Sequence, residues 1–246
     1  MDLVISAVTH RTGSTLLQRI FNVRKKTLIW GEHDGCLKDF YNIYRKARHY
    51  SVDLSNQREK YFNNNEDPNC WIACMIPDIE FLDKALVKGI KSFFKHLYLQ
   101  YPGDHDIIGF KEVRYGKKEL ELIRRCYPKA NIILLIRNPI DVWKSMVGAG
   151  LGNNINYMIK KWNKNGEDYL DISQSDPHSH IITYENLINK EYSTISKIKK
   201  IGKITTDDIY RVLDHKLVST SKEISKKEEQ MILNKCKSTM KKYNYL

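Results

Sequence analysis

Short apolar runs alternate along the chain with longer segments in which apolar residues recur at helical spacing. A short run bounded by polar residues is typical of a buried strand, and the longer period is typical of an amphipathic helix. The runs predict strands at residues 3–8, 27–30, 106–112, 131–136 and 181–184. The longer segments predict helices at residues 16–21, 81–99, 117–126, 157–170 and 225–241, and another that begins at Asn138-Pro139. This alternation indicates an α/β fold, a parallel sheet flanked by helices.

Residues 50–80 read as irregular, and the polar stretch at residues 63–69 predicts a loop. The chain contains neither an internal repeat nor a low-complexity linker. A length of 246 residues suits one domain. We therefore expect a single domain over residues 1–246.

The composition is that of a globular protein. Hydrophobic residues make up 41% of the chain and aromatic residues 11%, which excludes a chain that is disordered throughout. The longest aliphatic run, residues 132–136, is far shorter than the roughly 20 apolar residues of a membrane span. No secretory signal is visible, and the five cysteines are scattered. We expect reduced thiols, no metal site and a cytoplasmic location.

The net charge of +12 comes from 41 Lys and Arg residues against 29 Asp and Glu residues. Such a balance fits a partner rich in phosphate or sulfate, or simply a lysine-rich surface. Between residues 190 and 242 the lysines are interleaved with acidic residues, as on exposed helix faces. No known nucleic-acid-binding motif is visible, so we expect no nucleic-acid partner.

Residues 10–15, His-Arg-Thr-Gly-Ser-Thr, stand between the first predicted strand and the first predicted helix. The N–H groups of a helix start and its dipole favour a phosphate group. Gly13 allows a tight backbone path, Ser14 and Thr15 offer hydroxyl donors, and Arg11 offers a bidentate cation. The loop lacks the Gly-Lys-Ser/Thr of a Walker A motif. The alternative is a helix end that Thr12 or Ser14 merely caps.

A second candidate anion site follows the strand at residues 131–136. Arg137 stands at the carboxyl end of that strand, where open α/β sheets bind ligands. Ser145 lies eight residues further on, about two turns into the next helix. The alternative is an Arg137–Asp141 ion pair with Ser145 exposed to solvent.

Together the two segments resemble the PAPS-dependent sulfotransferases, in particular their bacterial and tyrosylprotein branch. These enzymes transfer a sulfuryl group from 3'-phosphoadenosine 5'-phosphosulfate (PAPS) to a hydroxyl or amine. Residues 11–15 resemble the family's 5'-phosphosulfate loop, and the Arg137-Asn-Pro-x-Asp core with Ser145 resembles its 3'-phosphate motif. Residues 181–187 resemble its Tyr-Glu-x-Leu segment. The resemblance implies a P-loop-type parallel sheet, PAPS as donor and 3'-phosphoadenosine 5'-phosphate (PAP) as product.

The resemblance also suggests a general base and a leaving-group cation. Glu32, in the Gly-Glu-His segment at residues 31–33, resembles the base of the bacterial and tyrosylprotein branch, while cytosolic members use a histidine and would favour His33. Lys111 resembles the lysine that contacts the oxygen bridging sulfur and phosphate, and Arg11 would share that task. A fixed cation there stabilises charge that develops as the bond breaks.

The chain departs from the family in two places. Cytosolic members often have Lys where Arg11 stands, and the C-terminal Arg-Lys-Gly-x-x-Gly loop is absent. Residues 218–222, with Ser221, are the candidate replacement near the 3'-phosphate. Residues 38–105 and 150–180 are expected to form an acceptor pocket or lid for a small molecule or a glycan.

Two other functions remain open from the sequence. A nucleotide kinase or NTPase would use the loop at residues 10–15, although it would need the missing Walker A lysine. A non-catalytic polyanion-binding module would explain the charge but not Glu32 and Lys111.

Overall fold

The computed structural model describes residues 1–98, 100–101, 103–215 and 221–246. Its centre is one parallel sheet of five strands in the order β2-β3-β1-β4-β5. The strands are β1 (Leu3–Ala7), β2 (Thr27–Trp30), β3 (Ile107–Glu112), β4 (Asn131–Ile136) and β5 (Ser179–Thr183). All five predicted strands are confirmed, and the predicted P-loop-type α/β fold is confirmed with them.

Strands β1 and β4 are apolar except for Ser6 and Asn131, because both faces of the sheet are covered. All five residues of β1 are buried, as are the last five of β4. Parallel sheets show such continuous apolar runs because crossover helices cover both of their faces. On one face, alternate β1 residues Leu3, Ile5 and Ala7 pack in one cluster with helices α1 (Ser14–Asn22), α9 (Tyr192–Gly202) and α10 (Thr206–Leu213).

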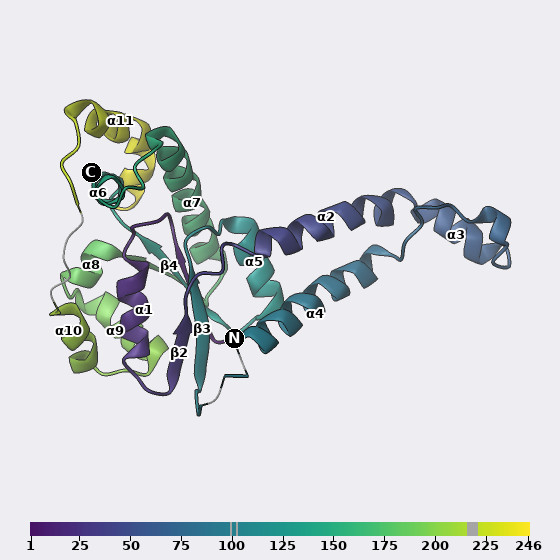
Figure 1. The fold of residues 1–246 in the computed structure, drawn as a ribbon, viewed down its shortest axis with the longest axis horizontal. Helices are drawn as coiled ribbons and strands as arrows, with labels where there is room; N and C mark the ends of the chain where they lie inside the picture. The colour runs from purple at the N-terminus through teal and green to yellow at the C-terminus, as the bar shows by residue number, and fades with distance from the viewer. Residues whose placement is uncertain (99, 102, 216–220) are drawn as a thin grey trace. The chain divides into compact units, whose positions relative to one another are not determined.

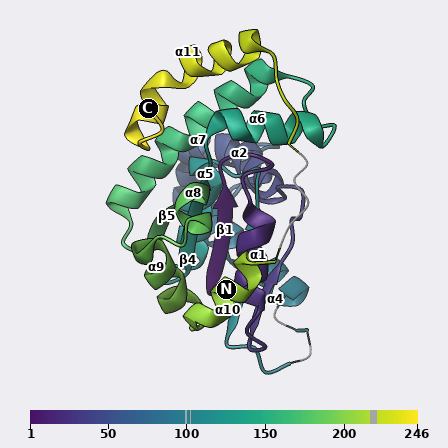
Figure 2. The ribbon, with the colours of Figure 1, turned by 90° about the vertical axis from the view of Figure 1, so that its left-hand side faces the viewer.

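The other face of the sheet meets α7 (Ile155–Ser175). The Ser6 hydroxyl of β1 hydrogen-bonds to the Tyr169 hydroxyl of α7 at 2.8 Å. Figures 1 and 2 show α7 on the side of the sheet away from α1. The remaining helices of this part are α5 (Lys117–Cys126), α6 (Pro139–Gly148), α8 (Tyr184–Ile188) and α11 (Lys226–Lys242). The predicted start of α6 is confirmed, since the Asn138 side chain caps it and Pro139 is its first residue.

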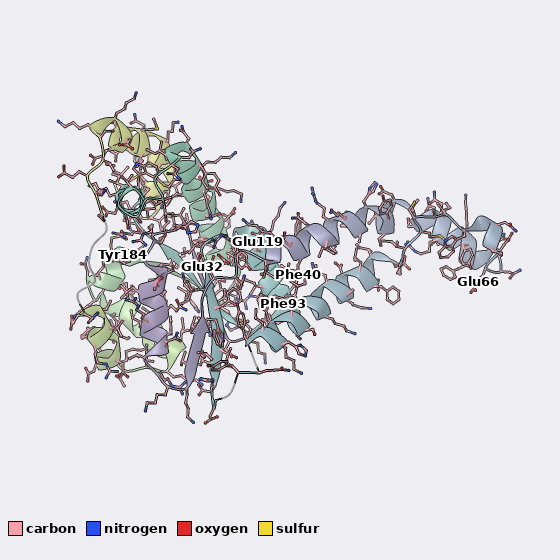
Figure 3. All side chains as sticks on the ribbon, viewed as in Figure 1. Glu32, Phe40, Glu66, Phe93, Glu119 and Tyr184 are labelled. Carbon is pink, nitrogen blue, oxygen red and sulfur yellow. The ribbon has the colours of Figure 1, made fainter. Side chains whose placement is uncertain are left out.

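The chain divides into two compact units: residues 1–34 with 101–246, and residues 35–100. The second unit contains α2 (Leu37–Asp53), α3 (Ser55–Asn63), a short 3-10 helix (Pro68–Cys70) and α4 (Ile79–Tyr98). Helices α2 and α4 pack against each other, with Phe40 and Phe93 in edge-to-face contact at 5.5 Å (Figure 3).

The second unit also corrects the prediction that residues 50–80 are irregular. The end of α2 and all of α3 are helical there. Helix α2 fully buries only Leu37 and Ser51, so its sequence shows a weak apolar face. Packing against α4 supplies the stability that local pattern does not reveal. Among the described residues no helix is both long and apolar enough to cross a membrane.

Candidate functional site

The carboxyl ends of all five parallel strands lie at one edge of the sheet, and a cavity of about 340 Å³ opens there. Every strand contributes to the cavity wall at least one residue, which lies at its carboxyl end or shortly after it. The wall is formed by His10, Arg11, Gly13, Ser14, Thr15, Leu16, Glu32, Lys111, Val113, Arg137, Ser145, Leu151, Tyr184 and Ser221. Segments far apart in the sequence therefore meet in one site.

The loop between β1 and α1 forms one wall. Arg11 and Gly13 both have positive φ angles, 65° and 96°. An added Cβ at Gly13 would lie 2.3 Å from Cδ2 of Tyr184, so this position requires glycine both for its backbone angle and for its neighbour. Leu16 and Leu17 donate the first helical hydrogen bonds to the Gly13 carbonyl. The amides of Ser14 and Thr15 precede that ladder and stand at the positive end of the helix.

The loop after β4 meets the first loop directly. Arg11 Nε donates to the Ser145 hydroxyl at 3.2 Å, and Arg137 Nη1 donates to the Arg11 carbonyl at 3.2 Å. The Arg137 guanidinium lies 4.3 Å from the ring centre of Tyr184. Its Nε atom is buried and has no hydrogen-bond partner within the described part of the chain. The two anion sites expected from the sequence are thus two sides of one cavity.

Glu32 and Lys111 face each other across the ends of β2 and β3. Lys111 Nζ forms an ion pair with Glu32 Oε1, and Arg114 Nη1 donates to Glu32 Oε2 at 2.6 Å. Arg114 also binds Oε1 of the fully buried Glu112 and Oδ1 of Asp34, each at 2.9 Å. One guanidinium thus holds three carboxylates.

The charge state of Glu32 follows from these contacts. Burial disfavours its carboxylate, but the hydrogen bonds from Lys111 and Arg114 outweigh burial and lower its pKa. About a quarter of the side chain (26%) is exposed, against 9% for Lys111. An ionised carboxylate therefore stands at the cavity wall, while the lysine beside it is mostly enclosed.

Comparison with known proteins then identifies the family. The model of the sulfotransferase family matches residues 8–208, which is most of the chain. The chain belongs to the sulfotransferase family. No curated protein sequence matches it.

Solved sulfotransferases share the fold of this family member at low sequence identity. The sulfotransferase domain of the olefin synthase from Synechococcus PCC 7002 matches with a TM-score of 0.55 and 14% identity, over 94% of this chain and 82% of that one. Sulfotransferase STF9 from Mycobacterium avium matches with a TM-score of 0.54 and 11% identity, over 98% and 76%. The sulfotransferase domain of the curacin biosynthetic pathway matches with a TM-score of 0.50 and 16% identity, over 96% and 97%.

Two predicted residues of this sulfotransferase lie outside the cavity lining. Thr12 is fully buried, and its hydroxyl donates to the Thr9 carbonyl at 2.8 Å, which braces the loop. The backbone N–H of His33 points to the buried Glu112, and the imidazole Nδ1 lies 3.3 Å from the Tyr115 hydroxyl. Burial lowers the pKa of His33 despite the opposing charge of Glu112.

Ser221 does line the cavity of the sulfotransferase. The next residue is anchored nearby, because the Lys222 amide donates to the Lys144 carbonyl on α6 at 3.1 Å. The other members of that predicted segment, residues 218–220, lie outside the described residues.

Sequence reasoning did not name five residues of the cavity wall as site residues: His10, Leu16, Val113, Leu151 and Tyr184. Three of them, His10, Leu151 and Tyr184, lie in segments that it did select. Tyr184 could have been found, because it opens the Tyr-Glu-x-Leu segment directly after β5. His10 precedes Arg11 in the first loop, and burial, followed by the charges of Lys161 and Arg114, lowers its pKa.

Proposed function

We propose that this sulfotransferase moves a sulfuryl group from PAPS to a hydroxyl or amine of a small-molecule or glycan acceptor. The main support is the cavity at the carboxyl edge of the sheet. It joins two anion-binding loops to a carboxylate–lysine pair. Neither a simple phosphate site nor a surface charge cluster requires that combination.

The donor groups of the cavity match a ligand that is anionic at both ends. Arg11, Ser14 and Thr15 stand at the start of α1, and Arg137 and Ser145 stand after β4. Among the described residues, the buried Arg137 Nε has no hydrogen-bond partner, which is consistent with a role in holding a ligand. PAPS carries a 5'-phosphosulfate and a separate 3'-phosphate, and supplies a sulfuryl group on a phosphate leaving group. ATP has only one anionic end.

Glu32 is the proposed general base. Its lowered pKa keeps it ionised at neutral pH, so it can accept the proton of an acceptor hydroxyl or amine. Arg114 holds Glu32 Oε2 in place and leaves Oε1 to Lys111. The position of His33 behind Glu112 and Tyr115, outside the cavity lining, favours Glu32 over His33 for this role.

Lys111 and Arg11 are proposed to stabilise the leaving group. Lysine has a flexible stem, so the Lys111 ammonium can exchange Glu32 for the oxygen on which charge develops. Positioning and charge neutralisation then suffice for an in-line transfer, by analogy with phosphoryl transfer, and no covalent enzyme intermediate is needed. Leu151, from the expected acceptor segment at residues 150–180, lines the same cavity.

Thermal unfolding with PAP, AMP and ATP tests the donor. A ligand at 100 times its Kd stabilises a protein by about 2.7 kcal/mol. A shift with PAP and little with AMP is expected, because only PAP engages both loops. A shift with ATP at least as large would instead support a nucleotide kinase, and no shift with any of the three would support a polyanion-binding module.

A further inference from the structure

A second large cavity lies at the opposite edge of the sheet from the catalytic one. It has a volume of about 880 Å³, and its lining comes from the segments at the start of β4 and β5 and from α9. Its charged and titratable lining consists of Lys129, His178, His180, Lys197, Lys200 and Lys203. We call it the basic groove. The strands it adjoins lead away from it to Arg137 and Tyr184, so it is separate from the catalytic cavity.

The basic groove is one-sided in charge. Its twelve lining residues include four lysines and no carboxylate. One lysine is partly neutralised, since Lys203 Nζ lies 3.5 Å from Asp106. The N-terminus of α9 is already capped by Glu191, whose carboxylate accepts from the Ser193 and Thr194 amides at 3.0 and 2.8 Å. The positive potential therefore comes from the side chains and not from the helix end.

The floor of the groove is ordered by internal contacts. Lys197 Nζ donates to the Ile181 carbonyl at 3.4 Å, and His180 Nε2 lies 3.1 Å from Asn131 Oδ1. Burial, Lys197 and His178 together lower the pKa of His180, as expected for an imidazole among cations. Lys129, just before β4, and Lys200, on α9, are both exposed. Tyr192 is 85% exposed and offers a ring face at the rim.

We propose that the basic groove binds small ligands that carry two or more phosphate or sulfate groups. Exposed lysines from two different elements fit separate anionic groups of one molecule, whereas a single small anion would engage fewer of them. The volume falls in the range of small-molecule sites, roughly 300–1,000 Å³. This proposal does not depend on the proposed sulfuryl transfer.

Histidine NMR on the full-length protein tests it. Assigned through His178→Gln and His180→Gln variants, these two imidazoles report the groove, while His10 reports the catalytic cavity. The probes are inorganic pyrophosphate, sucrose octasulfate and inorganic phosphate. Saturable shifts at His178 and His180 with pyrophosphate or the octasulfate are expected, with a rise in the pKa of His180. Because sucrose octasulfate carries more charge than pyrophosphate, tighter binding of pyrophosphate would show that the groove prefers phosphate groups to sulfate groups.

A matched pair of double variants separates a site from net charge. Lys129→Glu with Lys200→Glu should weaken binding at least about tenfold, since two ion pairs are reversed. Lys237→Glu with Lys241→Glu, both exposed on α11, changes the net charge equally and should leave the affinity unchanged. Equal losses in both, absence of saturable shifts, or phosphate binding as tight as pyrophosphate would each overturn the proposal.

Discussion

The two edges of the sheet gather positive charge in different ways. At the carboxyl edge, cations surround a carboxylate: Glu32 binds Lys111 and Arg114. At the amino edge, the lysines of the basic groove have no carboxylate among the residues that line it. Cations alone hold an anion, but a base beside a movable cation also allows proton transfer. The comparison teaches that the position of one carboxylate distinguishes the proposed reaction site from the proposed binding site.

Removal of the negative charge of Glu32 should have the largest effect on kcat. Glu32→Gln keeps the size of the side chain but removes the proton acceptor, so kcat should fall about 10²- to 10⁴-fold. PAP affinity should stay nearly intact, because the anion loops are unchanged. Steady-state kinetics and PAP titration of the same variant measure both. Wild-type turnover in Glu32→Gln would show that another group is the base.

Arg137→Ala should damage binding and leave the base in place. Loss of a charge-assisted contact costs about 1.5–3 kcal/mol, which is roughly a 10- to 100-fold loss of PAP affinity. AMP lacks the 3'-phosphate and should bind both proteins alike. Isothermal titration with the two nucleotides provides the comparison. An equal loss of AMP affinity would show that Arg137 does not contact the 3'-phosphate.

Gly13→Ala should destabilise the phosphate loop. The φ of 96° and the nearby Tyr184 ring leave no room for a Cβ, and we expect a loss of about 1–3 kcal/mol in the free energy of unfolding. Gly89→Ala in α4 is the matched control, because nothing lies within 4 Å of its added Cβ. Alanine there should be neutral or stabilise the helix by about 0.5–1 kcal/mol. Denaturant unfolding of both variants tests the contrast.

The pH profile of kcat should reveal the cations around Glu32. With Glu32 as the proposed base, activity should require the ionised carboxylate, so it should be full above the pKa of Glu32 and fall as pH drops through it. Hydrogen bonds from Lys111 and Arg114 lower that pKa against the effect of burial, so the acid limb should lie below the ordinary glutamate range. Arg114→Gln should move the limb upward, because a cation is lost.

Asp34→Asn tests the opposite change, because Asp34 is a carboxylate bound to the same Arg114 guanidinium. It removes a negative charge near Glu32 and should move the limb slightly in the opposite direction. Arg114→Lys, which keeps the charge, covers the case in which Arg114→Gln fails to fold. Identical limbs in all these variants would contradict the role given to Arg114.

The smallest effect on kcat is expected from substitutions in the basic groove. Lys129→Glu with Lys200→Glu should leave kcat within about twofold, because substitutions at distant sites without shared partners act independently. A large change in kcat would show that the basic groove and the cavity at the carboxyl edge are functionally coupled.

The fold was accessible from the sequence because strands in a doubly covered parallel sheet are locally apolar. The runs at residues 27–30 and 131–136 predicted β2 and β4 to the residue. The helix start at Asn138-Pro139 was equally local, since capping chemistry concerns neighbouring residues. By contrast, the sequence pattern does not predict α2, and it predicts irregular structure where α3 lies. Exposed apolar residues such as Ile43 and Val52 blur the helical period of α2, and its stability comes from α4.

The chemistry of this protein divides in the same way. The sequence alone was enough to select the two loops that we propose bind the donor, because a glycine loop before a helix and an arginine after a strand are local features. Only the tertiary structure brought Glu32 to Lys111, 79 residues away, and Arg11 to Ser145, 134 residues away. It also shows that His33 lies outside the cavity lining and that four lysines line the basic groove. Parallel strand order decides which ends meet, and contacts between distant residues set the charge and access of each group.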